Sequence, residues 1–225
     1  MHILEHYNPP TEPWLEVIHV DDDLLVLNKP SGLLSVPGKH PDHKDCLQAR
    51  AVAEYPTATT IHRLDMETSG VIVMALNREA HAHVGKQFER RKITKTYIAR
   101  LYGLVEADKG EIDLPLICDW PNRPRQMVDH ERGKQALTRF EVLERETHSD
   151  PDKCATRVAF YPVTGRSHQL RVHALSMGHP ILGDSLYGAE TSQKADTRLQ
   201  LHAKSLELHS PIAGQQMSFT SPAPF

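Results

Sequence analysis

The apolar residues of this chain fall mostly in short runs, a pattern that is typical of β-strands. Residues 71–76 read Val-Ile-Val-Met-Ala-Leu, and such an uninterrupted apolar run predicts a strand that is buried on both faces. Other runs rich in β-branched and aromatic residues predict strands at residues 15–20, 24–28, 93–102, 110–114, 137–143, 155–161, 199–208 and 216–219. The aspartates at residues 21–23 predict a hairpin turn between the first two of these strands.

Helices are predicted at residues 45–54, 79–90 and 167–177, and Gly178 and Pro180 end the last of them. The predicted strands outnumber the helices. Most of them follow one another through loops that are too short for repeated βαβ crossovers. We therefore expect an α+β fold built on a mixed, largely antiparallel β-sheet with flanking helices and loops.

The composition is that of a folded globular protein, with 225 residues of which 39% are hydrophobic and 24% are charged. Residues 1–13 contain Pro9, Pro10 and Pro13 and no periodic pattern, so we expect an irregular arm there and a single domain over residues 14–225. No apolar run approaches the roughly 18 residues of a membrane span, and the first residues do not have the pattern of a secretion signal. We expect a cytoplasmic protein.

The cysteines and histidines do not have the spacing of a metal site. Cys46, Cys118 and Cys154 lie far apart and form no Cys-x-x-Cys pair, so neither a disulfide framework nor a thiolate metal site is indicated. His168 and His173 are five residues apart and would fall on different sides of a helix, whereas paired ligands on one helix need a spacing of four. We expect no bound metal.

The formal net charge of −3 argues against indiscriminate binding to nucleic acid, so any RNA-binding surface must be local. The sequence offers two basic segments. One contains Lys86, Arg90, Arg91, Lys92 and Lys95 against a single acid, Glu89; the other is the proline-rich segment with Arg123 and Arg125. The alternative for each segment is an ordinary solvated surface.

Asp65 is the first candidate for chemistry. It lies in the run His62-Arg63-Leu64-Asp65-Met66-Glu67-Thr68-Ser69-Gly70, directly before the predicted strand at residues 71–76. Gly70 permits a tight backbone path, and the hydroxyls of Thr68 and Ser69 can bind loop amides, so the carboxylate could be held rigidly. The local pattern alone favours a turn aspartate that accepts backbone N–H bonds.

A second constellation precedes and includes the predicted helix at residues 167–177. If the helix begins near residue 167, Arg166, Gln169, Leu170 and His173 share one side of it and Arg171 points elsewhere. Tyr97 lies in a predicted strand beside the first basic segment. A ring beside cationic side chains can stack an unpaired base and hold its phosphates, although strand tyrosines are also common in cores.

These motifs and their order resemble the RluA-type family of pseudouridine synthases. The resemblance covers nearly the whole chain from about Trp14. It is carried by Asn28-Lys29-Pro30-Ser31-Gly32, His62-Arg63-Leu64-Asp65, Thr68-Ser69-Gly70, Lys95-Thr96-Tyr97, Thr164-Gly165-Arg166, His168-Gln169-Leu170-Arg171 and His173.

The resemblance implies roles for individual residues. Asp65 would be the nucleophile, Arg166 its ion-pair partner, Tyr97 the ring that stacks on the target uracil and Leu170 an apolar wall of the pocket. Arg63 would lie near the flipped nucleotide. For RNA binding we expect Lys86, Arg90, Arg91, Lys92, Lys95, Arg123, Arg125, Arg171 and His173.

The resemblance also implies the partner. Family members often carry an N-terminal S4-type RNA-binding domain, which we do not expect here because the first family motif begins at Asn28. The sequence of residues 116–124 is similar to that of family members that modify both 23S ribosomal RNA and the anticodon stem-loop of transfer RNA. We expect a monomer that binds these RNAs and neither DNA nor a membrane.

The implied reaction isomerises uridine to pseudouridine without a cofactor, because it breaks the N1–C1′ bond and joins C5 to C1′ with no redox change. The target nucleotide must leave its stack, which costs a few kcal/mol. The sequence does not decide whether Asp65 attacks C1′, attacks C6 or removes the C2′ proton. Alternatives are a single-substrate enzyme of the family, an RNA N-glycosidase, which needs two cooperating carboxylates, and a non-catalytic RNA chaperone.

Overall fold

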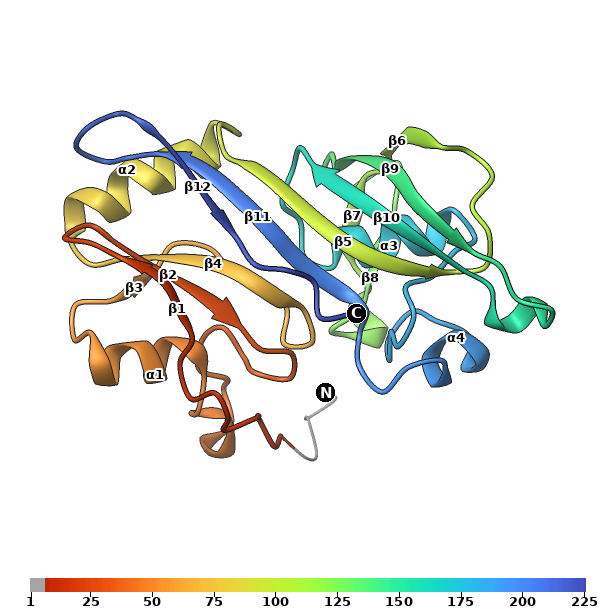
Figure 1. Ribbon diagram of the computed structural model, residues 1–225, viewed down its shortest axis with the longest axis horizontal. Helices are drawn as coiled ribbons and strands as arrows, with labels where there is room; N and C mark the ends of the chain where they lie inside the picture. Colours follow the sequence, from red (N-terminus) through yellow and green to blue (C-terminus); the bar gives the residue numbers. More distant parts are fainter. Residues whose placement is uncertain (1–6) are drawn as a thin grey trace. The chain divides into compact units, whose positions relative to one another are not determined.

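The computed structural model describes residues 7–225 and divides into two compact units, each with its own hydrophobic core (Figure 1). The unit that contains Asp65, here called the Asp65 unit, comprises residues 7–95 and 202–224. The central unit comprises residues 96–201 together with Phe225. None of the helices in residues 7–225 has the length and apolar character of a membrane span.

The Asp65 unit is built on a mixed group of strands. Its elements are β1 (Val17–Val20), β2 (Leu24–Lys29), η1 (Pro41–His43), α1 (Leu47–Glu54), β3 (Thr59–Thr60), β4 (Ser69–Ala75), α2 (Arg78–Glu89), β11 (Leu201–His209) and β12 (Gln216–Thr220). The pairs β1–β2, β2–β4, β3–β4 and β11–β12 are antiparallel, whereas β4 and β11 are parallel. Every residue of β4 is buried, which confirms the strand predicted from the apolar run.

Local side-chain contacts explain where these elements begin. Asp21 accepts hydrogen bonds from the backbone N–H groups of Asp23 and Leu24, at 2.9 and 2.7 Å, and so forms the predicted turn between β1 and β2. Asn77 caps α2 by accepting from the N–H of Ala80 at 2.8 Å.

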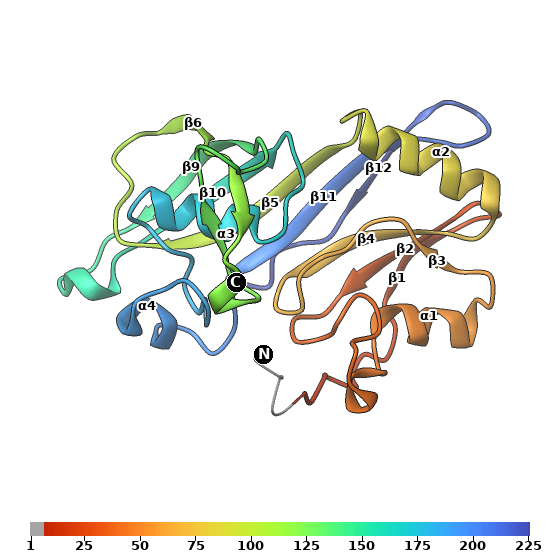
Figure 2. The same ribbon diagram turned by 180° about the vertical axis from the view of Figure 1, so that it is seen from behind.

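The central unit is an antiparallel sheet with α3 on one face (Figure 2). Its elements are β5 (Thr94–Tyr102), β6 (Lys109–Asp113), β7 (Leu116–Cys118), η2 (Trp120–Asn122), β8 (Gln126–Val128), β9 (Leu137–Glu146), η3 (Pro151–Lys153), β10 (Ala155–Pro162), α3 (Gln169–Ser176) and α4 (Glu190–Lys194). The strand order is β5-β10-β9-β6, and β7 pairs with β8 in a separate hairpin. Leu170 and Ala174 of α3 pack into the core formed by the sheet.

The predicted fold class is confirmed: the sheet is mixed and mostly antiparallel, and the long strands and helices lie close to their predicted positions. The prediction for α3 was wrong at its start. His168 adopts a left-handed backbone conformation with φ +54°, so the helix begins at Gln169 and Arg166 lies in the preceding loop. The predicted arm is partly described: residues 7–13 contain no helix or strand, and residues 1–6 lie outside the described part.

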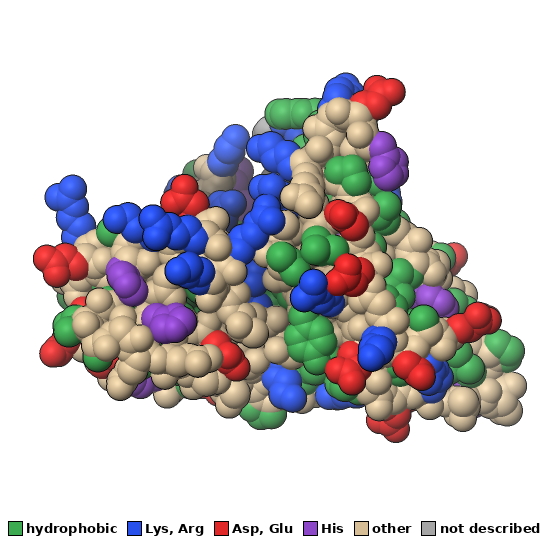
Figure 3. Space-filling view, turned by 90° about the horizontal axis from the view of Figure 1, so that it is seen from above, with side chains coloured by type: hydrophobic (Ala, Val, Ile, Leu, Met, Phe, Trp, Pro, Cys, Tyr) green, Lys and Arg blue, Asp and Glu red, His purple; other side chains and the backbone are tan. Residues whose placement is uncertain are grey.

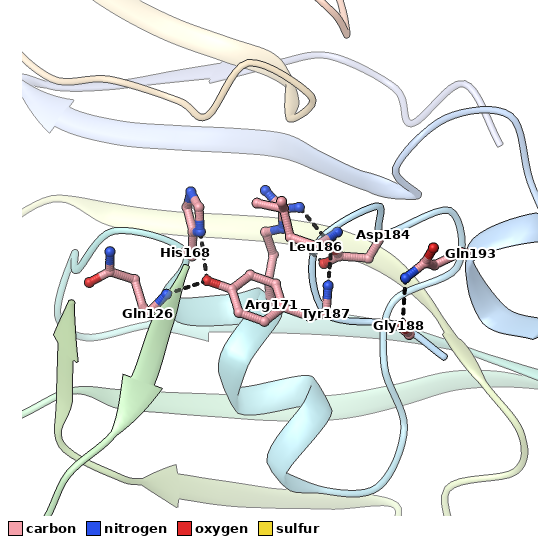
Figure 4. A network of polar contacts seen from close by, with 8 residues as sticks. All are labelled: Gln126, His168, Arg171, Asp184, Leu186, Tyr187, Gly188 and Gln193. Carbon is pink, nitrogen blue, oxygen red and sulfur yellow. Dashed lines mark hydrogen bonds and ion pairs between the residues drawn. The ribbon is translucent and has the colours of Figure 1, made fainter. Parts of the chain in front are cut away.

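A buried ion pair ties α3 to the segment that follows it (Figure 4). Arg171 donates from Nε and Nη2 to the carboxylate of Asp184 at 2.8 and 2.6 Å, and both side chains are almost completely buried. Asp184 also accepts from the N–H groups of Leu186 and Tyr187, at 3.0 and 3.1 Å. A single carboxylate thus fixes both the helix and the chain beyond it.

A histidine in the loop between β3 and β4 binds back to the backbone of β4. His62 Nε2 accepts a hydrogen bond from the backbone N–H of Val73 at 3.1 Å, and its ring lies 4.6 Å from that of Phe88. Burial, and to a smaller extent the positive charge of Lys95, lowers the pKa of His62 from its ordinary 6.5 to about 3. The imidazole is therefore neutral at pH 7, as an acceptor for Val73 must be.

Removal of the buried carboxylate should strongly destabilise the protein. We expect Asp184→Asn to lower the free energy of unfolding by about 3 kcal/mol or more, because it leaves the Arg171 guanidinium buried with an uncompensated charge. Urea unfolding monitored by circular dichroism measures this. Glu190→Gln, which breaks an exposed ion pair with Lys194, is the control and should change stability by less than about 0.5 kcal/mol. Equal effects would contradict the interpretation.

The neutral histidine should make stability depend on pH. Below pH 6.5 the unfolded chain binds a proton at His62 that the folded chain does not bind until about pH 3, so acidification across this range lowers stability by up to about 1.4 kcal/mol per pH unit. His62→Gln keeps an acceptor for Val73 but does not titrate, so its stability should fall less steeply between pH 6.5 and 5. His130→Gln, at an exposed histidine, should leave the slope unchanged. Parallel curves for His62→Gln and the parent protein would refute the prediction.

Candidate functional site

Asp65 lies in the loop between β3 and β4, and it is partly buried. Its backbone carbonyl accepts from the N–H of Thr68 at 3.2 Å, which closes a turn at the Asp65 position. Arg63, two residues earlier, is exposed to solvent. The loop therefore presents a carboxylate and an accessible guanidinium a short distance apart along the chain.

The buried side chain of Lys29 binds the backbone of this loop. Its Nζ donates hydrogen bonds to three backbone carbonyls, those of Pro30 at 2.9 Å, Leu33 at 2.6 Å and Met66 at 2.9 Å. Lys29 has no exposed surface, so its amino group must find such acceptors within the protein. Because Met66 directly follows Asp65, the lysine fixes the backbone at the candidate nucleophile.

Residues close to Lys29 bind the loop on both sides of Asp65. The Oγ of Ser35 donates to the carbonyl of Leu64 at 2.6 Å and accepts from the N–H of the same residue at 3.1 Å. After Asp65, the Oγ of Ser31 donates to the carbonyl of Glu67 at 2.7 Å. In the sequence, Lys29-Pro30-Ser31-Gly32 stood out only as part of a family motif. The contacts of this segment show that it supports the Asp65 loop.

The start of β4 explains the Thr-Ser-Gly sequence. Gly70 has φ +112°, and a Cβ at this position would lie 2.3 Å from the carbonyl oxygen of Ala203, so no other residue fits against β11 there. The Ser69 hydroxyl lies 2.8 Å from Nδ1 of His202, and this contact fastens the end of the loop to β11.

The first basic segment forms an exposed patch at the C-terminal end of α2. In Figure 3, Lys and Arg side chains gather at the left of the view, the side on which α2 lies in Figure 1. The patch consists of Lys86, Arg90, Arg91 and Lys92, which are all exposed, and within residues 7–225 none of them forms an ion pair. Lys95 differs from these four, because burial lowers the pKa of its amino group from 10.5 to about 8.

Arg91 holds an unfavourable backbone conformation. Its φ is +55°, and the N–H groups of Arg91 and Lys92 bind the carbonyls of Phe88 and Gln87 at 3.1 and 2.9 Å in the last turn of α2. Glycine normally occupies this helix-ending position, because a Cβ there costs roughly 1–2 kcal/mol. The chain therefore carries an exposed arginine where glycine would be more stable.

The central unit contains the other predicted pocket residues. Tyr97 on β5 and Leu170 on α3 pack against the same hydrophobic core. Arg166 is exposed in the loop before α3, where its Nε donates to the carbonyl of Gln135 at 3.1 Å and its N–H binds Oε1 of Gln169 at 3.0 Å. The roles of these three residues stay predictions.

Two of the expected RNA-binding residues are buried, which contradicts their prediction. Arg171 is 2% exposed and is engaged by Asp184, as described above. His173 has no exposed surface; its Nδ1 lies 2.9 Å from Thr138 Oγ1 and its Nε2 lies 3.2 Å from the carbonyl of Leu114. Burial also lowers the pKa of His173, so the ring does not carry a charge for a phosphate at neutral pH.

Arg123 and Arg125 lie in the loop between β7 and β8. Arg123 is exposed and Arg125 is partly buried, with its guanidinium carbon 5.4 Å from the centre of the Tyr187 ring.

Among residues 7–225, no group of three or more His, Cys, Asp and Glu side chains is placed to hold a metal ion.

Comparison with known proteins identifies the family. The family model for RNA pseudouridylate synthase matches residues 23–176. The chain is 50% identical over 222 residues to the dual-specificity RNA pseudouridine synthase RluA of Escherichia coli (strain K12), with 99% of each chain covered. It is also 50% identical over 219 residues to the protein of that name from Vibrio vulnificus (strain CMCP6), covering 97% of this chain and 87% of the other.

A solved structure agrees with the sequence comparisons. The human protein RNA Pseudouridylate Synthase Domain Containing 1 superimposes with a TM-score of 0.79 at 29% identity, over 97% of this chain and 87% of the human chain. The family model and the relatives both include the Asp65 loop and the segment that holds it. The chain belongs to the RNA pseudouridylate synthase family.

Proposed function

We propose that this RNA pseudouridine synthase modifies uridines in stem-loops of both 23S ribosomal RNA and transfer RNA, with Asp65 as its nucleophile. The observation that carries the assignment of Asp65 is the clamp on its loop: Lys29 and Ser31 bind the backbone after Asp65, and Ser35 binds it before. A carboxylate on so constrained a loop is pre-positioned for attack. The dual specificity rests on the relatives that carry this name and match the chain almost end to end.

The reaction needs a single carboxylate and no electron acceptor. The N1–C1′ bond breaks, the uracil turns while it is held in the pocket, and C5 forms the new bond to C1′. C5 then loses its proton and N1 takes one up, so the product is an isomer of uridine. Asp65 can support this by attack at C1′, by addition at C6 of the base or by removal of the C2′ proton. In each case the base must first leave its stack and enter the pocket.

The remaining pocket residues have complementary roles in the proposal. A guanidinium favours the ionised form of a carboxylate, and we assign this role to Arg166. Tyr97 stacks on the uracil, Leu170 provides an apolar wall, and Arg63 contacts the flipped nucleotide. The patch of Lys86, Arg90, Arg91 and Lys92 binds phosphates, because its charges are exposed and not neutralised by acids among the described residues.

Replacement of the nucleophile should abolish the reaction but not binding. We expect Asp65→Asn to lower pseudouridine formation at least about a thousandfold while it still binds a stem-loop RNA. Chemical mapping of pseudouridine in 23S ribosomal RNA and in transfer RNA, together with filter binding, measures both quantities. Glu67→Gln, which removes a carboxylate two residues away, is the matched control and should retain activity. Normal modification by Asp65→Asn would disprove the assignment, and release of free uracil by the parent protein would indicate an N-glycosidase.

Arg91 should show opposite effects on stability and on binding. We expect Arg91→Gly to raise the free energy of unfolding by about 1 kcal/mol, because glycine adopts φ +55° without strain. The same change should weaken RNA binding and reduce the slope of its salt dependence by about one, because one phosphate contact is lost. Urea unfolding and a salt titration of RNA affinity measure the two effects.

Arg90→Ala separates charge from backbone strain. Arg90 has an ordinary φ of −83°, so its replacement should weaken binding as Arg91→Gly does, but without the gain in stability. An unchanged salt slope for both variants would exclude the patch from the RNA interface.

A further inference from the structure

Trp120 is a large aromatic side chain that the central unit leaves in solvent. It begins η2, the short 3₁₀ turn between β7 and β8, and 64% of its surface is exposed. The guanidinium carbon of Arg123 lies 4.4 Å from the centre of the indole ring. Because so much of the indole is exposed although a cation is stacked on it, a large part of its π-surface is open to a ligand.

The loop that carries Trp120 is closed by its own hydrogen bonds. The N–H of Asp119 binds the carbonyl of Arg125 at 3.0 Å, and the N–H of Arg125 binds the carbonyl of Asn122 at 3.1 Å. The side-chain amide of Asn122 donates to the carboxylate of Asp119 at 2.9 Å. Pro121 and Pro124 restrict the backbone further. The exposed ring is therefore held in place by a structured turn.

A second set of contacts anchors the base of the loop to the start of α3 (Figure 4). The hydroxyl of Tyr187 accepts from the backbone N–H of Gln126 at 2.7 Å and lies 2.7 Å from Nδ1 of His168. The Tyr187 ring also lies 5.3 Å from the guanidinium carbon of Arg171. The loop thus has a fixed position relative to the helix that carries Leu170, a predicted pocket residue.

We propose that Trp120 is a second base-stacking site of this enzyme, which holds one unpaired nucleobase of the RNA loop outside the catalytic pocket. The inference rests on the proposed function, since it assumes an RNA stem-loop as substrate. Stacking on an aromatic ring needs an unstacked base, which a stem-loop offers and a continuous duplex does not. Arg123 supplies positive charge beside the ring for the phosphates of the same strand, and Arg125 adds a second charge in the same loop.

The surroundings of the ring favour a nucleic acid over an apolar partner. The loop carries two arginines, and its one acid, Asp119, is engaged by the Asn122 amide. The indole has a cation stacked on it, which suits a planar base with an adjacent phosphate. A protein partner that buried this ring in an apolar interface would have to desolvate the Arg123 charge.

The test compares Trp120→Ala and Trp120→Phe with the parent protein. Loss of one stacked base corresponds to roughly a tenfold weaker binding, so we expect Trp120→Ala to raise the Kd for a stem-loop RNA about tenfold, and Trp120→Phe to raise it about threefold or less. Binding of a blunt RNA duplex should change by less than twofold. In turnover experiments, KM should rise far more than kcat falls.

A matched control and a direct readout accompany the two variants. Ile212→Ala removes a side chain that is 81% exposed and belongs to the Asp65 unit, and it should leave the Kd unchanged. In a Trp14→Phe protein, Trp120 is the sole tryptophan, and its fluorescence should be quenched on titration with the stem-loop but not with the duplex. Unfolding midpoints of Trp120→Ala and Trp120→Phe should match the parent, because Trp120 is exposed.

The outcomes separate this inference from the proposed function. If the parent protein makes pseudouridine but Trp120→Ala binds and turns over the stem-loop normally, the second stacking site is wrong and the proposed function stands. If the parent makes no pseudouridine while Trp120 is still quenched by stem-loop RNA, the proposed function fails and the stacking site stands. Equal weakening of stem-loop and duplex binding, or loss of self-association in Trp120→Ala, would overturn the assignment to an unpaired base.

Discussion

The geometry around Asp65 depends on one interaction, the binding of the buried Lys29 amino group by three backbone carbonyls. A lysine without exposed surface is strongly unfavourable unless all of its donors are satisfied. Two of the carbonyls, those of Pro30 and Leu33, belong to the segment that follows β2, and the third belongs to Met66. The loop can move away from this segment only if the buried Lys29 amino group loses a hydrogen-bond partner. The folded state is therefore stable only with the loop in this position.

This arrangement solves a problem that catalysis by a loop residue presents. Loops are the mobile parts of most proteins, whereas a nucleophile must be held close to its productive position. Here one end of the loop continues into β4, whose residues are all buried, and Gly70 lets that strand lie directly against the backbone of Ala203. The other end is bound by Ser35. The loop that carries the carboxylate is thus restrained at both of its ends.

The elements that could be predicted from the sequence are those whose pattern extends over only a few neighbouring residues. The apolar run at β4, the Asp21 turn and the end of α3 at Gly178 all follow from patterns of a few residues. The role of Lys29 could not be predicted in this way, because its partners are backbone carbonyls and every residue has one. The start of α3 was misplaced because His168 takes a left-handed conformation for which its residue type gives no clear signal.

The arginines show why charge in a sequence does not by itself predict a binding surface. Arg171 can be buried because Asp184, thirteen residues later, neutralises its charge. The spacing of the two residues in the sequence does not predict this ion pair. Arg91 is exposed in a strained conformation, and Arg123 lies on an exposed indole. Only exposure and the absence of a neutralising acid distinguish cations that can meet a phosphate from those that hold the fold. A protein with a net charge of −3 can therefore bind RNA, because its binding depends on the few cations that the fold leaves uncompensated.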